Sequence, residues 1–295
     1  MTHSTMFLNN VTSVDHAYIG TDGWVHGNSY SPVFEVGGKV DPHENVVVDF
    51  STVKKDIKKC IDDSSDGLDH KLWFIPGYSN GSIEFQNGRV LIETPHFKYY
   101  GAKDSVNVIP YTVFDESLIT GSHVHKYLLK KYPDINIELK CKTDMAPTIP
   151  FKDVMEQRFH YTHGLKNSTS WGCQNMMHGH ASFLVTDKPE KYDYKLDLLL
   201  TMIASAIDNK MFVWDENWFP KTKTINYESS DRGEFFLQFK DEVKVDQKII
   251  VLSTETTVEH LADYVAQAWG SHLTDLGVKK VYVSEGQNKG AVAEL

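Results

Sequence analysis

Three histidines and a cysteine near the middle of the chain could together form a metal site with a reactive thiol. His178 and His180 flank one glycine, so on a β-strand both imidazoles leave the same face. His163 lies upstream, where a preceding antiparallel strand would bring a third imidazole beside them. Three neutral imidazoles with one open coordination position are the ligand set of a catalytic zinc. Cys173 lies between them in sequence and could act as a base or nucleophile. Single histidines of this kind are often surface residues, but the set with its cysteine favours a functional site.

The composition is typical of a soluble globular protein. A chain of 295 residues can form one large domain or two of ordinary size. It contains no run of eighteen apolar residues, so we expect no membrane span. The first residues lack the basic and apolar regions of a signal peptide. Three widely spaced cysteines do not suggest a disulfide framework. We therefore predict a cytoplasmic protein with reduced thiols.

The formal net charge of −10 argues against a general nucleic-acid binder, because such proteins need a basic surface. It does not exclude an anionic small molecule as ligand, since that requires only a local cluster of Lys or Arg.

Five short motifs occur in the same order in each half of the chain. In the first half they are His16, His26-Gly27-Asn28, Asp49-Phe50, Asp69-His70-Lys71-Leu72 and Lys142-Thr143. In the second half they are His163, His178-Gly179-His180, Asp193-Tyr194, Asp208-Asn209-Lys210-Met211 and Glu285-Gly286. An ordered repeat of this kind indicates two copies of one structural unit. We predict two tandem units, residues 1–146 and 147–295, with the boundary in the proline-containing segment 143–150.

Within each half the pattern predicts strand, strand, helix, insert, helix and strand. The predicted helices begin after Asp49-Phe50, span 121–132 and about 194–207, and begin after Thr256-Thr257. The predicted final strands are 135–142 and 278–284. The first insert, residues 82–93, reads as a hairpin with an Asn87-Gly88 turn. The second insert reads as another hairpin, formed by residues 234–239 and 248–252.

These motifs resemble the 6-pyruvoyl-tetrahydropterin synthase and 6-carboxy-tetrahydropterin synthase family, which has the tunnelling fold. The family pattern Phe-x-x-x-His is matched by Phe159 to His163, and the cysteine before His-Gly-His by Cys173. Leu68-Asp69-His70-Lys71-Leu72 matches the family's Leu-Asp-His-x-Leu. Thr256-Thr257-Val258-Glu259 is similar to its Pro-Thr-x-Glu without the proline, and Glu285 matches the Glu that ends its last strand.

The resemblance implies an α+β fold of two tandem tunnelling-fold units. Each unit would be an antiparallel sheet with two helices on one face, and units would close into a barrel by pairing edge strands. Six units per particle would correspond to a homo-oligomer of three chains.

Each half departs from the family pattern in a different way. In the first half Asn28 replaces a metal ligand, a residue near Asp22 replaces the cysteine, and Lys142 stands where the pterin-binding Glu would be. In the second half Asp208-Asn209 replaces the Asp-His pair. The family builds its site from two subunits, so we expect Asp69-His70 of one unit to complete the site of the other. The alternative is that the first half is a decayed scaffold.

The resemblance also implies a role for each site residue. His163, His178 and His180 would hold Zn²⁺. Cys173 would be the general base, and His70, oriented by Asp69, would move a second proton. Glu285 and Glu259 would bind the pterin ring of 7,8-dihydroneopterin triphosphate. From the residues alone, Cys173 could instead be a zinc ligand, and Glu285, Asp69 and His70 could be surface or turn residues.

The product remains open between two members of the family. We predict 6-carboxytetrahydropterin, which would place the protein in 7-deazaguanine or queuosine synthesis. The alternative is the 6-pyruvoyl product, because the spacing of Cys173 and His178 does not decide between them. A non-catalytic pterin- or purine-binding protein on the same fold is a third possibility, motivated by the loss of the second Asp-His pair. A GTP cyclohydrolase is less favoured, since the cysteine-rich metal pattern of those enzymes is missing.

Overall fold

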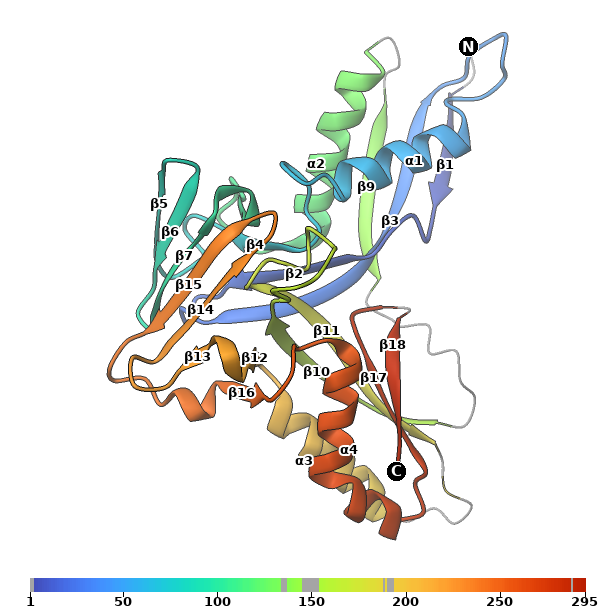
Figure 1. Cartoon of the computed structure of the whole chain (residues 1–295). Coiled ribbons are helices and arrows are strands. Elements are labelled where there is room, and N and C mark those ends of the chain that lie inside the picture. The colour runs from blue at the N-terminus through green and yellow to red at the C-terminus, as the bar shows by residue number, and fades with distance from the viewer. Residues whose placement is uncertain (1–2, 134–136, 145–153, 188, 190–193, 288) are drawn as a thin grey trace.

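The computed structural model describes residues 3–133, 137–144, 154–187, 189, 194–287 and 289–295. These residues form four α-helices and three six-stranded sheets, so the chain has a mixed α+β fold (Figure 1). The predicted boundary at residues 146 and 147 and the motif residue Asp193 lie outside the described residues. The division into two units stays a prediction. Within the described part, no helix is both long and apolar enough to cross a membrane.

Each half of the chain builds one sheet. The first sheet contains, in order of pairing, β1 (His3–Leu8), β3 (Val25–Lys39), β2 (Val14–Ile19), β4 (Lys71–Phe74) and β8 (Val106–Val108), with β9 (Glu138–Asp144) also paired to β3. The second contains β16 (Ile249–Leu252), β12 (Lys210–Trp214), β10 (Val154–His163), β11 (His178–Asp187), β17 (Lys280–Ser284) and β18 (Gly290–Glu294).

The two sheets follow one pairing scheme. The first two strands of each half, β2 with β3 and β10 with β11, pair antiparallel. In the first half β2 also pairs parallel with β4, and β4 with β8. In the second half β10 pairs parallel with β12, and β12 with β16. The sheets are therefore mixed, and the expectation of purely antiparallel sheets is wrong. Parallel neighbours need a long connection, which in each half contains the first helix for the first of these pairs and the strands of the insert for the second.

The four α-helices are α1 (Phe50–Ile61), α2 (Glu116–Lys131), α3 (Tyr194–Ile207) and α4 (Val258–Asp275). Three short 3₁₀ helices among the described residues are η1 (Lys103–Ser105), η2 (Asp215–Asn217) and η3 (Val245–Gln247). The pair α1 and α2 packs on the first sheet, and the pair α3 and α4 packs on the second (Figure 1). Each sheet and its helix pair thus enclose one hydrophobic core.

The predicted helices are confirmed, with one shifted start. The carboxylate of Asp49 caps α1 by accepting from the Thr52 N–H, and α3 has the predicted bounds. The helix expected from Gly121 begins at Glu116 instead, because Asp115 caps it by accepting from the Leu118 N–H at 2.9 Å.

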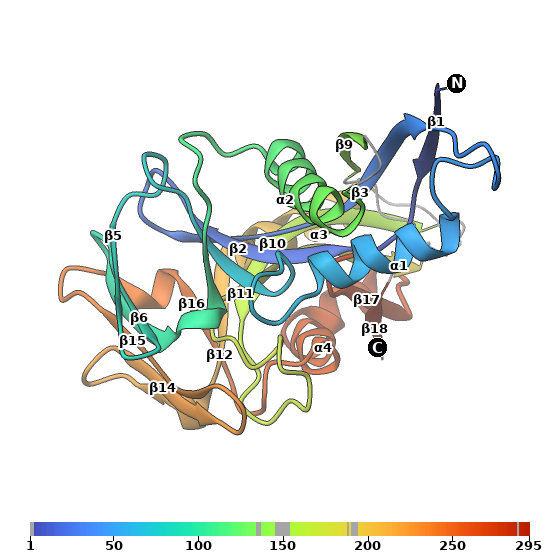
Figure 2. The same ribbon diagram turned by 90° about the horizontal axis from the view of Figure 1, so that it is seen from above.

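The inserts of the two halves join in a third sheet. Its order is β13 (Trp218–Phe219), β14 (Thr224–Ser229), β15 (Gly233–Phe239), β7 (Phe97–Ala102), β6 (Arg89–Glu93) and β5 (Ser82–Gln86). The strand β15 of the second half pairs with β7 of the first. Both views show this sheet at one end of the molecule, away from the N-terminal strand (Figures 1 and 2). It covers a core built from both halves.

The two hairpin predictions have different outcomes. The first is confirmed: β5 and β6 pair across Asn87 and Gly88, whose φ angles of 50° and 76° are those of a type I′ turn. The second is wrong. The strand β15 pairs with β14 and β7, whereas β16 lies in another sheet beside β12. An apolar run identifies a strand, but its periodicity does not identify the partner.

The two main sheets cross where Gly27 of β3 meets Gly179 of β11. A Cβ on Gly27 would lie 2.1 Å from the carbonyl oxygen of Tyr161, and one on Gly179 would lie 2.4 Å from the Gly27 Cα. These contacts are with main-chain atoms, which cannot rotate away. Only glycine at both positions allows the strands to approach this closely.

We predict that Gly179→Ala lowers the free energy of unfolding by about 3 kcal/mol, since the new methyl group must force the two sheets apart. Urea denaturation measures the change. Gly270→Ala is the matched control, because its Cβ would meet only the end of the Leu295 side chain, at 3.3 Å. That variant lies inside α4 and should keep or raise stability. Equal losses in both variants would contradict the account of the crossing.

Candidate active site

The structure brings the three predicted metal ligands together. The strands β10 and β11 pair so that His163 faces His178 directly and Tyr161 faces His180. All three histidines are fully buried. Their ligand nitrogens lie within 4.8 Å of one another, and the Nε2 atoms of His163 and His180 are 3.1 Å apart. The expectation that a preceding antiparallel strand supplies the third imidazole is confirmed.

Main-chain carbonyls fix the tautomers of two of these rings. The Nδ1–H of His163 donates to the Thr256 carbonyl at 2.7 Å, and the Nδ1–H of His178 donates to the Asn175 carbonyl at 2.9 Å. Their Nε2 atoms therefore carry lone pairs. Among the described residues, His178 Nε2 is buried without a hydrogen-bond partner.

Two of the histidines are held in the form that binds metal. Burial lowers the pKa of His163 to about 3, with a contribution from the neighbouring His180. Burial and the adjacent His163 also lower the pKa of His178 well below its ordinary value. Both rings are therefore neutral at pH 7.

These observations fit a zinc ion. Buried lone pairs that face one another are unfavourable unless a cation lies between them. Zinc binds imidazole nitrogens at about 2.0–2.1 Å, so ligand nitrogens around it lie roughly 3.3 Å apart. The spacing of 3.1 Å between His163 Nε2 and His180 Nε2 is close to that value. The identity of the metal stays a proposal.

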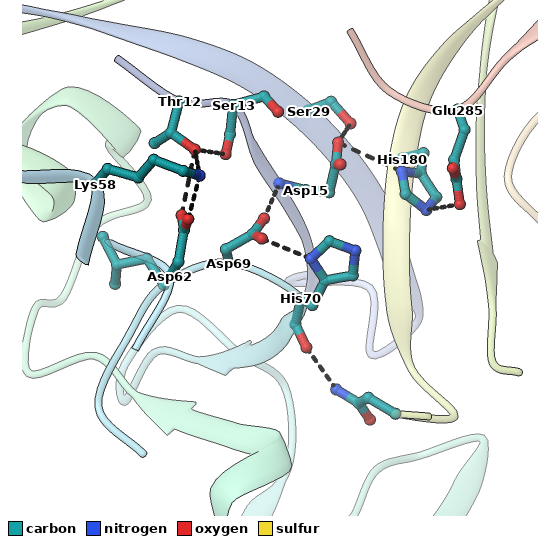
Figure 3. Close-up of polar contacts among 12 residues, drawn as sticks. Thr12, Ser13, Asp15, Ser29, Lys58, Asp62, Asp69, His70, His180 and Glu285 are labelled. Atoms are coloured by element: carbon teal, nitrogen blue, oxygen red, sulfur yellow. Dashed lines mark hydrogen bonds and ion pairs between the residues drawn. The ribbon is translucent and has the colours of Figure 1, made fainter. Parts of the chain in front are cut away.

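Asp15 of the first half links this centre to the other half of the chain. One carboxylate oxygen lies 3.4 Å from His180 Nδ1 and accepts from the Ser29 hydroxyl at 2.5 Å. The main chain of Asp15 donates to the Asp69 carboxylate at 2.8 Å (Figure 3). It also accepts from the His70 N–H at 2.6 Å. One residue thus orients a predicted ligand and anchors the Asp69-His70 pair.

His70 reaches the histidine centre from the first half. Its Nδ1 lies 2.6 Å from the Asp69 carboxylate, and its ring centroid lies 5.2 Å from that of His178. The ligand atoms of His70, Cys173 and His178 lie within 4.8 Å of one another. The Asp-His pair of one half and the cysteine of the other therefore meet within a single chain.

The Cys173 thiol and the His70 imidazole favour a charged pair. Burial alone would raise the pKa of Cys173, but the interaction with His70 brings it below its ordinary value. Burial alone would lower the pKa of His70, but the charge of Asp69 and the interaction with Cys173 raise it well above. The geometry thus stabilises thiolate and imidazolium together.

The two predicted pterin ligands lie in different places. A carboxylate oxygen of Glu285 is 3.9 Å from His180 Nε2, and the other is 3.3 Å from Lys289 Nζ. Burial would raise the pKa of Glu285, but His180 and Lys289 lower it, so this carboxylate is charged. Glu259 is exposed in the first turn of α4 and lies outside both histidine groups. Its role stays a prediction.

Asn209, which replaces the histidine of the Asp-His pair, lies beside the first half in the way that His70 lies beside the histidine centre. Asn209 has the same left-handed backbone as His70, with φ of 55° against 54°. Its N–H donates to the His160 carbonyl at 2.7 Å, while the Asp208 carboxylate accepts from the His160 N–H at 2.7 Å. Asn209 then lies 3.3 Å from His26, as His70 lies beside His178.

The predicted match of His16 with His163 is wrong: Tyr18 pairs with His26 as His163 pairs with His178, so Tyr18 holds the equivalent position and His16 is equivalent to Tyr161. His16 and Asn28 of the first half are engaged by protein groups. His16 is stacked on Trp73 with ring centroids 3.9 Å apart, and its Nε2 lies 3.5 Å from the Glu116 carboxylate. Asn28 donates to the same carboxylate. The metal-candidate groups among the described residues include none of these.

Comparison with known proteins gives partial structural similarities. No protein-family model and no curated protein matches the chain. A solved structure of Plasmodium vivax 6-pyruvoyltetrahydropterin synthase, a mutant of a catalytic residue, has 17% sequence identity and a TM-score of 0.38, and the match covers 48% of this chain and 92% of that chain. The Plasmodium falciparum 6-pyruvoyl tetrahydropterin synthase has 17% identity and a TM-score of 0.36 over 49% and 99% of the two chains. An uncharacterized protein of Wolinella succinogenes has 16% identity and a TM-score of 0.35 over 48% and 96%.

Sequence reasoning missed Asp15 and Lys289. Lys289 Nζ lies 3.4 Å from the Asp15 carboxylate and balances the charge of Asp15 and Glu285. Neither residue belongs to a motif. In the second half His160 holds the position of Asp15, since its main chain makes the same two bonds to Asp208 and Asn209, and the different residue type gave the repeat no signal for Asp15.

We predict that the purified protein binds one zinc ion per chain and that Asp15→Asn weakens its affinity by about 10- to 100-fold, as loss of a carboxylate behind a metal-bound histidine does. Chelator competition measures the affinity. Asp22→Asn is the matched control, because it removes a carboxylate 3.0 Å from His26, outside the centre. An unchanged affinity in Asp15→Asn would contradict the role of this carboxylate.

We also predict that Cys173 stays reactive toward iodoacetamide at acidic pH where an ordinary thiol, of pKa about 8.5, has lost its thiolate. A lowered pKa moves the loss of thiolate to lower pH. In metal-free protein, the pH profile of alkylation at Cys173 should shift upward in His70→Gln, which keeps the burial but removes the imidazolium. Burial raises the pKa of Cys60 and of Cys141 to about 12, so these thiols should be alkylated more slowly than Cys173 and serve as internal controls. A profile that His70→Gln does not move would contradict the pair.

Proposed function

We propose that the chain is a zinc-dependent lyase of the 6-carboxy-5,6,7,8-tetrahydropterin synthase type, acting on 7,8-dihydroneopterin triphosphate. One observation carries the proposal. Three convergent histidine nitrogens, a thiol lowered in pKa, an Asp-His pair and a charged carboxylate lie around one buried centre. These are the groups that the motif resemblance assigns to this chemistry. The tunnelling fold and a place in 7-deazaguanine or queuosine synthesis belong to the same proposal.

Each protein group has a task that its surroundings support. A zinc ion held by the histidines would supply Lewis acidity toward the hydroxyls of the substrate side chain. The Cys173 thiolate would take a proton from the carbon framework, since it is stabilised at neutral pH by His70. His70 would move a second proton through Nε2, because its Nδ1 is held by Asp69.

Glu285 would bind the pterin ring. A charged carboxylate can accept two hydrogen bonds from the adjacent amino and ring N–H groups of a pterin. Lys289 holds one of its oxygens at 3.3 Å and so fixes the direction of the other. Pterin binding at Glu285 would bring the substrate side chain toward the histidines, since Glu285 lies 3.9 Å from His180.

The proposed site does not need a second chain. The residues that the sequence assigned to two units, Asp69-His70 and Cys173, meet within one chain. The trimer of chains stays a prediction from the family resemblance, and it would not be required to bring these groups together.

The decisive experiment is incubation of the purified protein with 7,8-dihydroneopterin triphosphate. Release of acetaldehyde together with triphosphate is expected for the carboxy product. Release of triphosphate without acetaldehyde would indicate the 6-pyruvoyl product instead. Binding of the pterin without release of either would favour a non-catalytic protein.

We predict that Cys173→Ala lowers kcat by about 100-fold or more, since a positioned proton-transfer group contributes about 10²–10⁴. Asp69→Asn should lower kcat less, because the imidazole remains but loses the carboxylate that orients it. Cys141→Ala, in β9, is the matched control and should keep full activity. Full turnover by Cys173→Ala would exclude this mechanism.

A further inference from the structure

Two cations from different parts of the chain lie over the ring of Trp171. The Arg232 guanidinium carbon lies 3.4 Å from the centroid of the indole ring, and Lys71 Nζ lies 4.7 Å from it. Arg232 is only 4% exposed and Lys71 is fully buried. Contacts between cations and an aromatic ring are strongest when water is excluded, and here both cations are buried and Trp171 is partly buried.

Main-chain carbonyls hold both cations in place. Lys71 Nζ donates to the Ser64 carbonyl at 2.5 Å and to the Asp104 carbonyl. Arg232 Nη2 donates to the same Asp104 carbonyl at 3.3 Å. Asp104 belongs to η1, at the end of the first insert, and Arg232 lies in the turn between β14 and β15 of the second insert. The indole is thus fixed by both inserts together.

Trp171 belongs to the loop of residues 164–177, here called the Cys173 loop. Lys71 directly follows His70 in sequence. A Cβ on Gly172 would lie 3.0 Å from the Cβ of His70, so the loop runs against that residue between Trp171 and Cys173. The contact with Lys71, the first residue of β4, therefore fixes the Cys173 loop relative to the strand that His70 directly precedes.

The second insert and the first half also hold the rest of the Cys173 loop. Tyr227 donates to the Gln174 carbonyl at 2.8 Å, and the Gln174 amide donates to the Asp231 carboxylate at 2.6 Å. On the other side, the Asn175 amide donates to the carbonyls of His70 at 3.1 Å and Ser105 at 3.0 Å. The loop is thus bound on both sides of Cys173.

The first half repeats this arrangement. Trp24 lies in the equivalent loop, between β2 and β3. It stacks on His96 of the first insert, with centroids 4.1 Å apart and planes 7° from parallel. Lys248 of the second half lies 4.5 Å from its centroid. A tryptophan held by its own insert and by a lysine of the other half therefore occurs in both halves.

We propose that Trp171, with Arg232 and Lys71, is a positioning device that holds Cys173 against His70, and that this is the task of the paired inserts. The catalytic part of this inference rests on the proposed function. The structural part does not, because it concerns only the order of the Cys173 loop.

Hydrogen exchange followed by mass spectrometry tests the structural part in the full-length chain. In Trp171→Ala, exchange in peptides covering residues 165–177 should accelerate about tenfold or more, because local opening becomes easier. Trp171→Phe keeps an aromatic ring and should restore most of the protection. Trp24→Ala is the matched control: it should accelerate exchange near its own loop and leave residues 165–177 unchanged. Arg232→Gln provides a second variant, which removes the cation but keeps a side chain of similar length.

Kinetics test the catalytic part. Trp171→Ala should lower kcat about tenfold with KM nearly unchanged, because misplacement of a reacting group affects the transition state more than binding. Trp171→Phe should recover most of kcat. Trp24→Ala should keep wild-type kcat.

The outcomes separate the two proposals. Unchanged exchange at residues 165–177 in both Trp171→Ala and Arg232→Gln would overturn the positioning device. Faster exchange without any turnover by the wild type would support the device and count against the proposed lyase. Faster exchange with unchanged kcat would overturn the catalytic role of the device. Should Trp171→Ala fail to fold, the exchange rates of residues 165–177 in Arg232→Gln and in Trp24→Ala decide the same point. They should rise in Arg232→Gln and stay unchanged in Trp24→Ala.

Discussion

The close crossing of the two main sheets is the constraint on which the rest of the structure depends. Gly27 and Gly179 bring main-chain atoms of β3 and β11 into direct contact. Because β2 lies beside β3, the Asp15 carboxylate then lies 3.4 Å from His180. The main chain of Asp15 holds Asp69 and His70 near the same centre by two hydrogen bonds. A side chain at either glycine would separate the histidine centre from the groups that complete it. The middle residue of His-Gly-His is thus a packing requirement as well as a spacer between two ligands.

One lysine, Lys289 of the second half, lies beside the carboxylates of Asp15 in the first half and Glu285 in the second. Burial would raise the pKa of Asp15, but the neighbouring His180 and Lys289 lower it, so its carboxylate stays charged. Lys289 also pairs with Glu285. The partners of Asp15 are Lys289 and His180 of the second half and the Ser29 hydroxyl of the first, so this buried charge is stabilised only while both sheets are in place. Assembly of the crossing and preparation of the site are therefore one physical event.

The sequence predicted those features that depend on local periodicity. The two-residue spacing of His178 and His180 placed both rings on one face of β11, and the motif Asp49-Phe50 marked the start of α1. Several features that join distant segments were missed. Asp15 and His180 are far apart in sequence, as are Arg232 and Trp171, and no pattern within either segment indicates its partner. The same limit explains the wrong partner for β16: a strand can be recognised from its own residues, whereas its neighbour is chosen by the whole fold.

The hydrogen bonds between β15 and β7 have a consequence for how the chain folds. They join strands from the two halves, so this sheet can form only after most of the chain has left the ribosome. Until then β7 presents an unpaired edge, which is a template for association with another chain. Contacts of such long sequence separation also slow folding, since the intervening segment must be closed first. Expression of the first half alone would leave this edge permanently open and favour aggregation over a soluble half-molecule.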